Sequence, residues 1–350
     1  MLSILVAAAI VAAEPQGPPA AEPALPAAEV AKLESKHLRN IRQVTRGFAR
    51  AGEGYFRPDA KAIIFQANDP DKQDYQIYTQ DLAEGAKPQL VSTGEGKCTC
   101  SYYHPDGKSI LFASTHLDPA LKEGIPKPAT KTGPAYSRSE RYKWEFDPQM
   151  DIFKADLDGK NLVRVTDTPG YDAEGSYSAD GKQIIFTSFR DGNAEIYIMD
   201  ADGTNPRRIT DAKGYDGGPF FSPDGKKIIY RSDRKENDLL QLFINTPDGK
   251  NEKQLTDNKA VNWGPYFHPN SRHILYSTSI HGHSNYEIYL MDTETGQQER
   301  ITYREGFDGL PVFSPDGKKV LWTSKGRNPE NTSQLFIADF ELEPSATAAR

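Results

Sequence analysis

The chain has 350 residues, a formal net charge of −7, and 37% hydrophobic residues, with 17 Tyr and 16 Phe among its aromatic side chains. Charges of both signs are interspersed without a basic stripe, which argues against nucleic acid as the natural partner, while the apolar content can support a large core. After the first residues no apolar run is long enough to cross a bilayer, so no stable membrane span is expected, and we expect a monomer.

The chain begins with an apolar segment, residues 1–13 (MLSILVAAAIVAA), that is too short for a bilayer and ends in small residues. We interpret it as a signal peptide, which predicts a periplasmic or secreted protein. A basic n-region is missing, so a start methionine placed too far downstream, or a buried or trivial tail, is the alternative. Residues 14–36 follow; they are rich in Pro and Ala up to residue 30 without periodicity, which is typical of an extended tether.

Six copies of one phrase organise residues 37–342. An aromatic-rich strand runs into a Ser-Pro-Asp-Gly-Lys turn and then a β-branched strand, as in FFSPDGKKIIY (Phe220 to Tyr230) and VFSPDGKKVLW (Val312 to Trp322). The proline-equivalent positions are 58, 105, 179, 223, 269 and 315, so the steps are 47, 74, 44, 46 and 46 residues. A period in the mid-forties built only from strands predicts an all-β fold, a six-bladed β-propeller of four-stranded blades.

The last blade lacks its outer strand. After Gln334 to Phe340 the chain runs into a polar, Ala-rich tail, residues 343–350. At the other end, Ile41 to Thr45 (IRQVT) matches the outer-strand phrase and precedes the first blade. We therefore expect this N-terminal strand to complete blade six and close the ring, which protects the edges that an open array would expose.

Three phrases, SPDGKKIIY, EIYIMDADGTNPRRIT and SFRDGNAEIY, together resemble the TolB-type β-propeller repeat. The resemblance implies a periplasmic six-bladed propeller of the bacterial envelope that works through protein contacts rather than chemistry. TolB carries an α/β domain ahead of its propeller, and we expect the propeller alone here. The sequence also resembles the propeller of prolyl oligopeptidases, but no G-x-S-x-G nucleophile motif is present to accompany it.

Polar residues recur where the chain crosses from one blade to the next. In register, just ahead of the innermost strands, stand Ala51, Cys98, Asp172, Asp216, Asn262 and Asp308. Two residues further on stand Glu53, Cys100, Glu174, Gly218, Gly264 and Leu310. We expect the three Asp and the Asn to form an acidic channel mouth, with both Glu a step deeper or beside them. Converging carboxylates favour a cation or a basic side chain. Local capping of backbone N–H groups is the alternative.

The 74-residue step indicates an insertion, residues 116–148, between the second and third strands of blade two, over the same face. Its aromatic second half is expected to flank the channel mouth through Tyr142, Trp144 and Phe146. Long loops in compact domains are usually functional or disordered. Simple packing across blade two is the alternative.

Our leading hypothesis is a non-enzymatic scaffold that binds an envelope protein or peptide of basic character, or a small ligand, at this mouth. No cofactor is expected, with Ca²⁺ at the mouth as the alternative. The competing function is a metal-dependent carbohydrate-active enzyme, a lyase or hydrolase, because some lyases of acidic sugars use a related propeller with His ligands. Cys98 and Cys100 are two residues apart, so a strained bridge and two free thiols both stay open.

Overall fold

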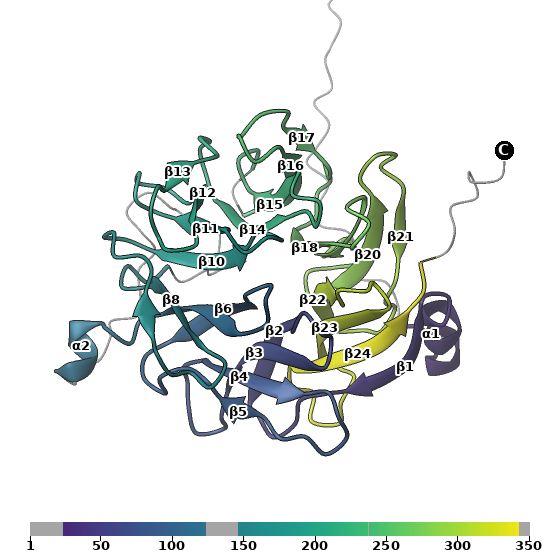
Figure 1. The fold of residues 1–350 in the computed structure, drawn as a ribbon. Coiled ribbons are helices and arrows are strands. Elements are labelled where there is room, and N and C mark those ends of the chain that lie inside the picture. The colour runs from purple at the N-terminus through teal and green to yellow at the C-terminus, as the bar shows by residue number, and fades with distance from the viewer. Residues whose placement is uncertain (1–23, 124–145, 237, 343–350) are drawn as a thin grey trace, which may run out of the picture.

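A computed structural model describes residues 24–123, 146–236 and 238–342. In these ranges six four-stranded antiparallel sheets stand radially about one axis (Figure 1), which confirms the predicted six-bladed propeller. Each blade runs from an innermost strand beside the axis to an outermost strand at the rim. The sandwiched faces of neighbouring blades form the core, whose largest fully buried side chains include Trp322, Tyr230 and Tyr276.

The strands follow the repeat. Blade one holds β2 (Arg50–Phe56), β3 (Ala62–Asn68), β4 (Gln76–Asp81) and β5 (Gln89–Leu90). Blade two holds β6 (Cys98–Tyr103), β7 (Ser109–Ser114), β8 (Asp151–Asp156) and β9 (Val163–Arg164). Blade three holds β10 (Asp172–Tyr177), β11 (Gln183–Ser188), β12 (Glu195–Asp200) and β13 (Arg207–Arg208). Blade four holds β14 (Asp216–Phe221), β15 (Ile228–Ser232), β16 (Gln241–Asn245) and β17 (Lys253–Gln254). Blade five holds β18 (Asn262–Phe267), β19 (His273–Thr278), β20 (Glu287–Asp292) and β21 (Gln298–Arg300). Blade six holds β22 (Phe307–Phe313), β23 (Lys319–Lys325), β24 (Gln334–Phe340) and β1 (Leu38–Gln43).

Ring closure comes from the N-terminal strand, as predicted. Strand β1 pairs antiparallel with β24, with Leu38 opposite Phe340 and Gln43 opposite Phe336. The strand begins three residues earlier than the predicted Ile41, and Thr45 continues the contact by accepting a hydrogen bond of 2.8 Å from the Leu335 amide. Blade six is thus built from both ends of the propeller, and Figure 1 shows purple β1 beside yellow β24.

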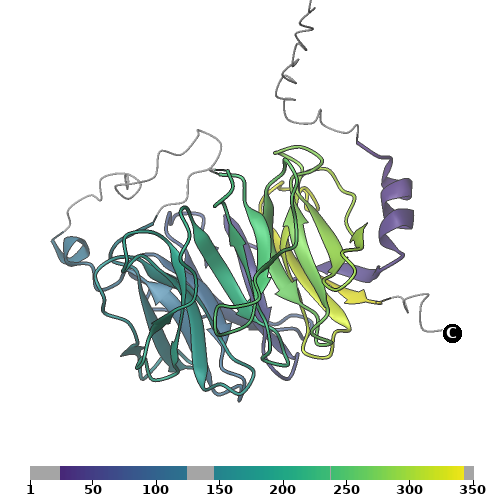
Figure 2. The same ribbon diagram turned by 90° about the horizontal axis from the view of Figure 1, so that it is seen from above.

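The segment ahead of β1 differs from the expected tether. Residues Ala27–Glu34 form the helix α1, so an extended conformation is wrong for this part of residues 14–36. The sequence AAEVAKLE contains mostly strong helix formers, and Pro26 stands at the position before the helix, where its missing N–H costs nothing. The helix packs beside blade six at the rim (Figure 2). The described part of the insertion adds the short helix α2 (Pro119–Lys122).

The two faces of the disc carry different connections. The turns between the first two strands of each blade lie on one face, which we call the hairpin face. The connections from an outermost strand to the next innermost strand lie on the other, which we call the crossing face, together with loops such as residues 69–75 of blade one. No helix among the described residues is long and apolar enough to cross a membrane.

Candidate functional site

A cavity of about 740 Å³ opens along the axis on the crossing face. Its wall contains the second residue of the predicted register in every blade: Glu53, Cys100, Glu174, Gly218, Gly264 and Leu310. All six have a positive φ, between 48° and 58°, and each lies where the pairing of the inner two strands shifts register. A β-bulge is therefore repeated six times, and it turns these six positions toward the axis.

Neighbouring blades hold several of these bulges in place. The amide of Glu53 donates to Thr323 Oγ1 at 3.0 Å, and the amide of Leu310 donates to Ser277 Oγ at 3.0 Å. In each case the acceptor lies on the second strand of the preceding blade. The positive φ of a side-chain-bearing residue such as Glu53 is strained, so these contacts stabilise a conformation that the chain alone would disfavour.

Aromatic rings close the bottom of the cavity. Tyr55, Tyr102, Phe220 and Tyr266 come from four different blades, and their ring centroids lie 5.1 to 6.2 Å apart. The hydroxyls of Tyr102 and Tyr266 form a hydrogen bond of 2.9 Å across the axis. Beyond this aromatic floor, the hairpin face carries a separate apolar depression of about 250 Å³ lined by the prolines of the turns. The channel is thus divided into two unlike ends.

The wall of the cavity is polar on one side and apolar on the other. Blades one to three contribute Glu53, Cys100 and Glu174 at the bulges, whereas blades four to six contribute glycine or leucine there. Trp263, Pro265 and other apolar side chains continue the second side. Gly218 and Gly264 make room for neighbouring side chains on that side, because a Cβ at Gly218 would collide with the Arg231 guanidinium and one at Gly264 would lie 3.1 Å from Leu310 Cδ2.

One buried ion pair dominates the polar side. Arg231 on β15 donates from Nη2 to Glu174 Oε1 at 2.6 Å, and both side chains are less than one tenth exposed. Glu174 also accepts hydrogen bonds from Tyr215 Oη at 2.9 Å, from the Gly218 amide at 2.8 Å and from Thr187 Oγ1 at 2.7 Å. The guanidinium lies over the rings of Tyr215 and Trp263 as well, with its carbon 5.5 and 5.8 Å from their centroids. The Glu174 carboxylate is therefore fully satisfied by the protein.

Glu53 lies in the same cavity but, unlike Glu174, has no basic partner among the described residues. Burial, together with the nearby Glu174 carboxylate, raises the pKa of Glu53 from 4.5 to about 7, although Arg231 acts in the opposite direction. Tyr55 Oη lies 3.5 Å from its carboxyl, and the Cys100 thiol is a further hydrogen-bond partner. Among the described residues Glu53 forms no ion pair. Near neutral pH this carboxyl is poised between its two protonation states.

The predicted acidic mouth is not part of this cavity. Asp172, Asp216, Asn262 and Asp308 are each no more than 1% exposed and lie behind the wall, between blades. In a regular strand, residues two apart share a face. The bulge breaks that alternation, so that Glu174 and Glu53 reach the cavity while the four earlier residues do not.

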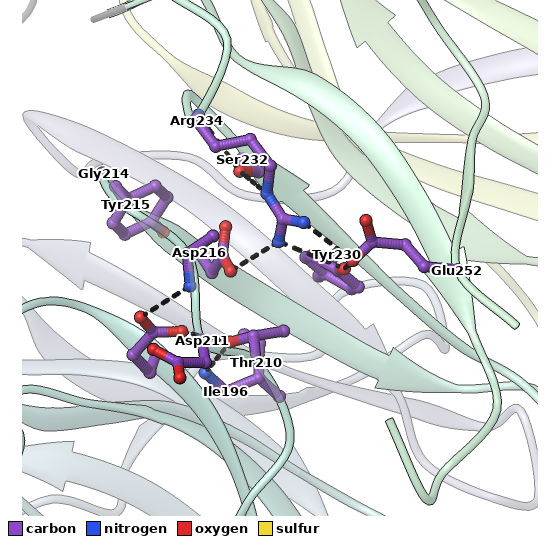
Figure 3. Close-up of polar contacts among 12 residues, drawn as sticks. Ile196, Thr210, Asp211, Gly214, Tyr215, Asp216, Tyr230, Ser232, Arg234 and Glu252 are labelled. Carbon is purple, nitrogen blue, oxygen red and sulfur yellow. Dashed lines mark hydrogen bonds and ion pairs between the residues drawn. The ribbon is translucent and has the colours of Figure 1, made fainter. Parts of the chain in front are cut away.

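Each buried Asp has a basic partner. Arg234 Nη2 donates to Asp216 Oδ2 at 2.6 Å, and its Nε donates to Ser232 at 2.9 Å (Figure 3). Burial raises the pKa of Asp216 to about 6, against the effect of Arg234. Arg190 makes the corresponding ion pair with Asp172 at 3.2 Å. These contacts fasten the start of an innermost strand to the loop after the second strand, which is a structural role.

Asp308 extends this arrangement to the N-terminal helix. Arg327 donates to Asp308 Oδ2 and to Glu34 Oε1, both at 2.5 Å, and all three side chains are buried. Glu34 Oε1 also accepts from the Tyr303 amide at 3.0 Å. Helix α1 is thus anchored to blade six through Arg327, whose counterparts in blades three and four pair with the aspartates of their own blades.

The aromatic residues of the insertion divide differently. Phe146 is 9% exposed and packs on Tyr171, Phe189 and Tyr215, with ring centroids 5.1, 4.5 and 5.7 Å away. It supports the cavity wall from behind through Tyr171, which lines the cavity. Tyr142 and Trp144 lie outside the described residues.

Sequence patterns did not predict that Arg231, Trp263 or Tyr171 belongs to this site. The repeat did contain a signal for Arg231. At its position in the second strand the other blades have small or uncharged residues, namely Gln66, Ala113, Thr187, Ser277 and Thr323. A single arginine at a buried strand position that is neutral in the five other blades indicates a charged partner present only next to this blade. Trp263 and Tyr171 carried no comparable signal.

The structure also places the two cysteines. Cys98 and Cys100 are both free thiols, Cys98 buried and Cys100 facing the cavity, so the bridge is not formed. Within the three described ranges no group of three or more His, Cys, Asp or Glu side chains is arranged to hold a metal ion.

Comparisons with known proteins agree with the fold. Residues 134–285 match the family model of the TolB beta propeller domain. A protein solved as TolB from Agrobacterium tumefaciens has 20% identity and a TM-score of 0.58 over 83% of this chain and 91% of its own. TolB from Acinetobacter baumannii has 22% identity and a TM-score of 0.57; the match covers 85% of this chain and 65% of that protein.

A third solved structure is that of an enzyme. An oligogalacturonate lyase in complex with manganese has 16% identity and a TM-score of 0.49, covering 86% of this chain and 93% of its own. This likeness is too weak to carry an argument about chemistry. A search of curated protein sequences finds no match. The repeat, the six closed blades and the family match together show that this chain is a TolB-like β-propeller repeat protein.

Proposed function

We propose that this protein is a non-enzymatic binding propeller of the bacterial envelope, which holds a protein segment or a small ligand in the cavity on its crossing face. The observation that carries the proposal is the cavity itself: about 740 Å³, closed below by aromatic rings, with one polar and one apolar side. Ligand sites have this character, being mostly apolar hollows with a few fixed polar groups.

The location rests on the sequence. Residues 1–13 form an apolar run of the length found in the core of a signal peptide and end in small residues, and the two TolB structures share the fold. We infer a periplasmic location and a partner from the envelope. The partner is a protein or peptide that places a basic side chain in the cavity, since its inner wall carries two glutamates and one arginine.

Selection from a displayed library of linear peptides tests the proposal. The library is selected in parallel on the wild-type protein and on Leu310→Trp. Leu310 lines the cavity beside Gly264 and already has a positive φ with a side chain, so an indole fills the space without a new backbone demand. Val163→Trp adds the same side chain at a residue of the rim that is 49% exposed, and serves as the control.

The proposal expects one family of peptides that is enriched on the wild type and on Val163→Trp but lost on Leu310→Trp. Unchanged thermal midpoints would show that both variants are folded. Equal enrichment on the filled cavity, or no enrichment on the wild type, would contradict a binding role for this cavity.

A further inference from the structure

The inner part of the cavity has more acidic than basic side chains. Its titratable wall consists of Glu53, Glu174 and Arg231, with Cys100 and tyrosines. Arg231 is committed to Glu174 at 2.6 Å and to Tyr215 at 2.7 Å. When Glu53 ionises, one carboxylate is in excess, and among the described residues it has no ion-pair partner. A partly desolvated carboxylate of this kind gains most from a cation that enters with the ligand.

The surroundings of Glu53 define what carries that cation. The floor beneath is aromatic, and the opposite wall is apolar, with Trp263, Pro265 and Leu310 among its residues. Aliphatic groups pack on such a surface, and aromatic faces attract cations. A charged head on an apolar stem matches the two sides of the cavity, whereas a small hydrated ion would leave the apolar side without contacts.

The entrance of the cavity has the opposite charge to its interior. On the blade-one and blade-two side it is lined by Arg50, Lys72 and Lys97, with Asp74 as the acidic member. Arg50 also lies over the ring of Tyr75, 5.1 Å from its centroid. A ligand that is basic throughout would be repelled here, while acidic groups next to the inserted cation would be attracted.

We propose that the cavity binds a lysine-like group, a cation on an aliphatic stem placed beside Glu53, within a ligand whose outer part is acidic or neutral. This inference rests on the proposed function and specifies its ligand chemistry. The group is supplied by a side chain of a peptide segment or by a free alkyl diamine, and the two sources share the same inner contact.

Proton linkage gives the proposal an independent signature. The groups facing Glu53 are Glu174 on β10, Arg231 on β15, Cys100 on β6, and Tyr55 and Tyr75 on blade one. Because burial and Glu174 raise the pKa of Glu53 to about 7, the carboxyl must lose a proton to pair with a cation. A lysine amine stays charged over this range, so binding should strengthen from pH 6 to pH 8.

Calorimetry with three peptide probes tests the inference. The first is Ac-Asp-Lys-Asp-NH2, the second replaces lysine with norleucine, and the third is Ac-Lys-Lys-Lys-NH2. Glu53→Gln keeps the shape of the side chain and removes its charge, and Glu84→Gln, at an exposed glutamate of blade one, is the matched control. 1,5-Diaminopentane represents the free diamine.

The inference expects the lysine probe to bind the wild type and Glu84→Gln at least about tenfold more tightly than the norleucine probe. Glu53→Gln should abolish that difference and the pH dependence, and the all-lysine probe should bind more weakly than the acid-flanked one. If the acid-flanked peptide binds more tightly than the diamine, a peptide segment supplies the cation. If the diamine binds as tightly or more tightly, a small molecule supplies it.

The inference and the proposed function fail in different ways. If lysine and norleucine probes bind equally and Leu310→Trp removes both, the cavity is a binding site but the cation has no role, and the inference is wrong. If the lysine probe does not bind the wild type at millimolar concentration, the inference is also wrong, while the library selection decides the proposed function separately.

Discussion

The guanidinium of Arg231 on β15 and the carboxylate of Glu174 on β10 meet at 2.6 Å between two blades, and they join the second strand of blade four to the innermost strand of blade three. The pair occupies the wall of the cavity, where the six-fold repeat of the sequence is broken. Both the stability of this part of the ring and the charge of the cavity depend on it.

Replacing Arg231 with Met should destabilise the fold by about 3 kcal/mol, because Glu174 would keep its buried charge and lose its partner. A second change, Glu174→Gln in the same chain, should restore at least half of the loss, since no uncompensated charge is left. Urea unfolding of the two variants measures both values. A loss below about 1 kcal/mol in the single variant would show that the pair is solvated and contributes little.

Removal of the N-terminal strand should open the ring. A chain that starts at Arg46 lacks α1 and β1, exposes the edge of β24 and leaves Arg327 without Glu34. Its thermal midpoint should fall by about 10 °C or more, and the free edge should promote aggregation. A chain that starts at Pro26 keeps both elements and is the control. Equal midpoints for the two truncated chains would mean that β1 is not required for closure.

Helix α1 should depend on one carboxylate. Glu34→Gln weakens two charge-assisted hydrogen bonds to Arg327, and the expected cost is about 2 kcal/mol. Hydrogen exchange of residues 27–36 should accelerate, while the inner strands stay protected. Glu29→Gln, an exposed glutamate of the same helix, should change neither quantity. Unaltered exchange in Glu34→Gln would show that α1 is held by other contacts.

The stability of the protein should fall as the pH rises through the range in which Glu53 titrates. Its pKa is about 7 in the folded state against an ordinary 4.5, so between these values the folded protein binds more protons than the unfolded chain. Glu53→Gln removes this effect. Relative to wild type, the variant should gain about 1 to 3 kcal/mol in unfolding free energy between pH 5 and pH 8. Parallel behaviour of the two proteins over this interval would place the pKa of Glu53 near its ordinary value.

Most of the fold could be predicted from the sequence because the propeller repeat occurs six times in it. The turn phrase fixed the number of blades, and the strand phrase near residue 41 identified the piece that completes blade six. Helix α1 was missed because a Pro- and Ala-rich stretch precedes it, and composition averaged over residues 14–36 hides an eight-residue run made mostly of good helix formers.

The site was predicted less well, for a reason that lies in the backbone. The predicted register was correct: it placed Gly218 two residues after Asp216 and Glu174 two residues after Asp172. Which member of each pair reaches the axis depends on a bulge that the sequence does not announce, since glutamate, cysteine and leucine occupy it as well as glycine. The aspartates that looked like a mouth are structural anchors, and the axis belongs to the residues two positions later.

The central claim, that Glu53 is the cation-accepting group of a binding cavity, is tested most directly by carbon NMR of protein labelled at the glutamate carboxyl carbon, with Glu53→Gln to assign the signal. In the free protein the Glu53 signal should titrate near pH 7, and saturating Ac-Asp-Lys-Asp-NH2 should lower that pKa by at least about one unit, because the ionised form is stabilised. A Glu53 signal that titrates near 4.5 in the free protein, or that is unmoved by the peptide, would contradict the account.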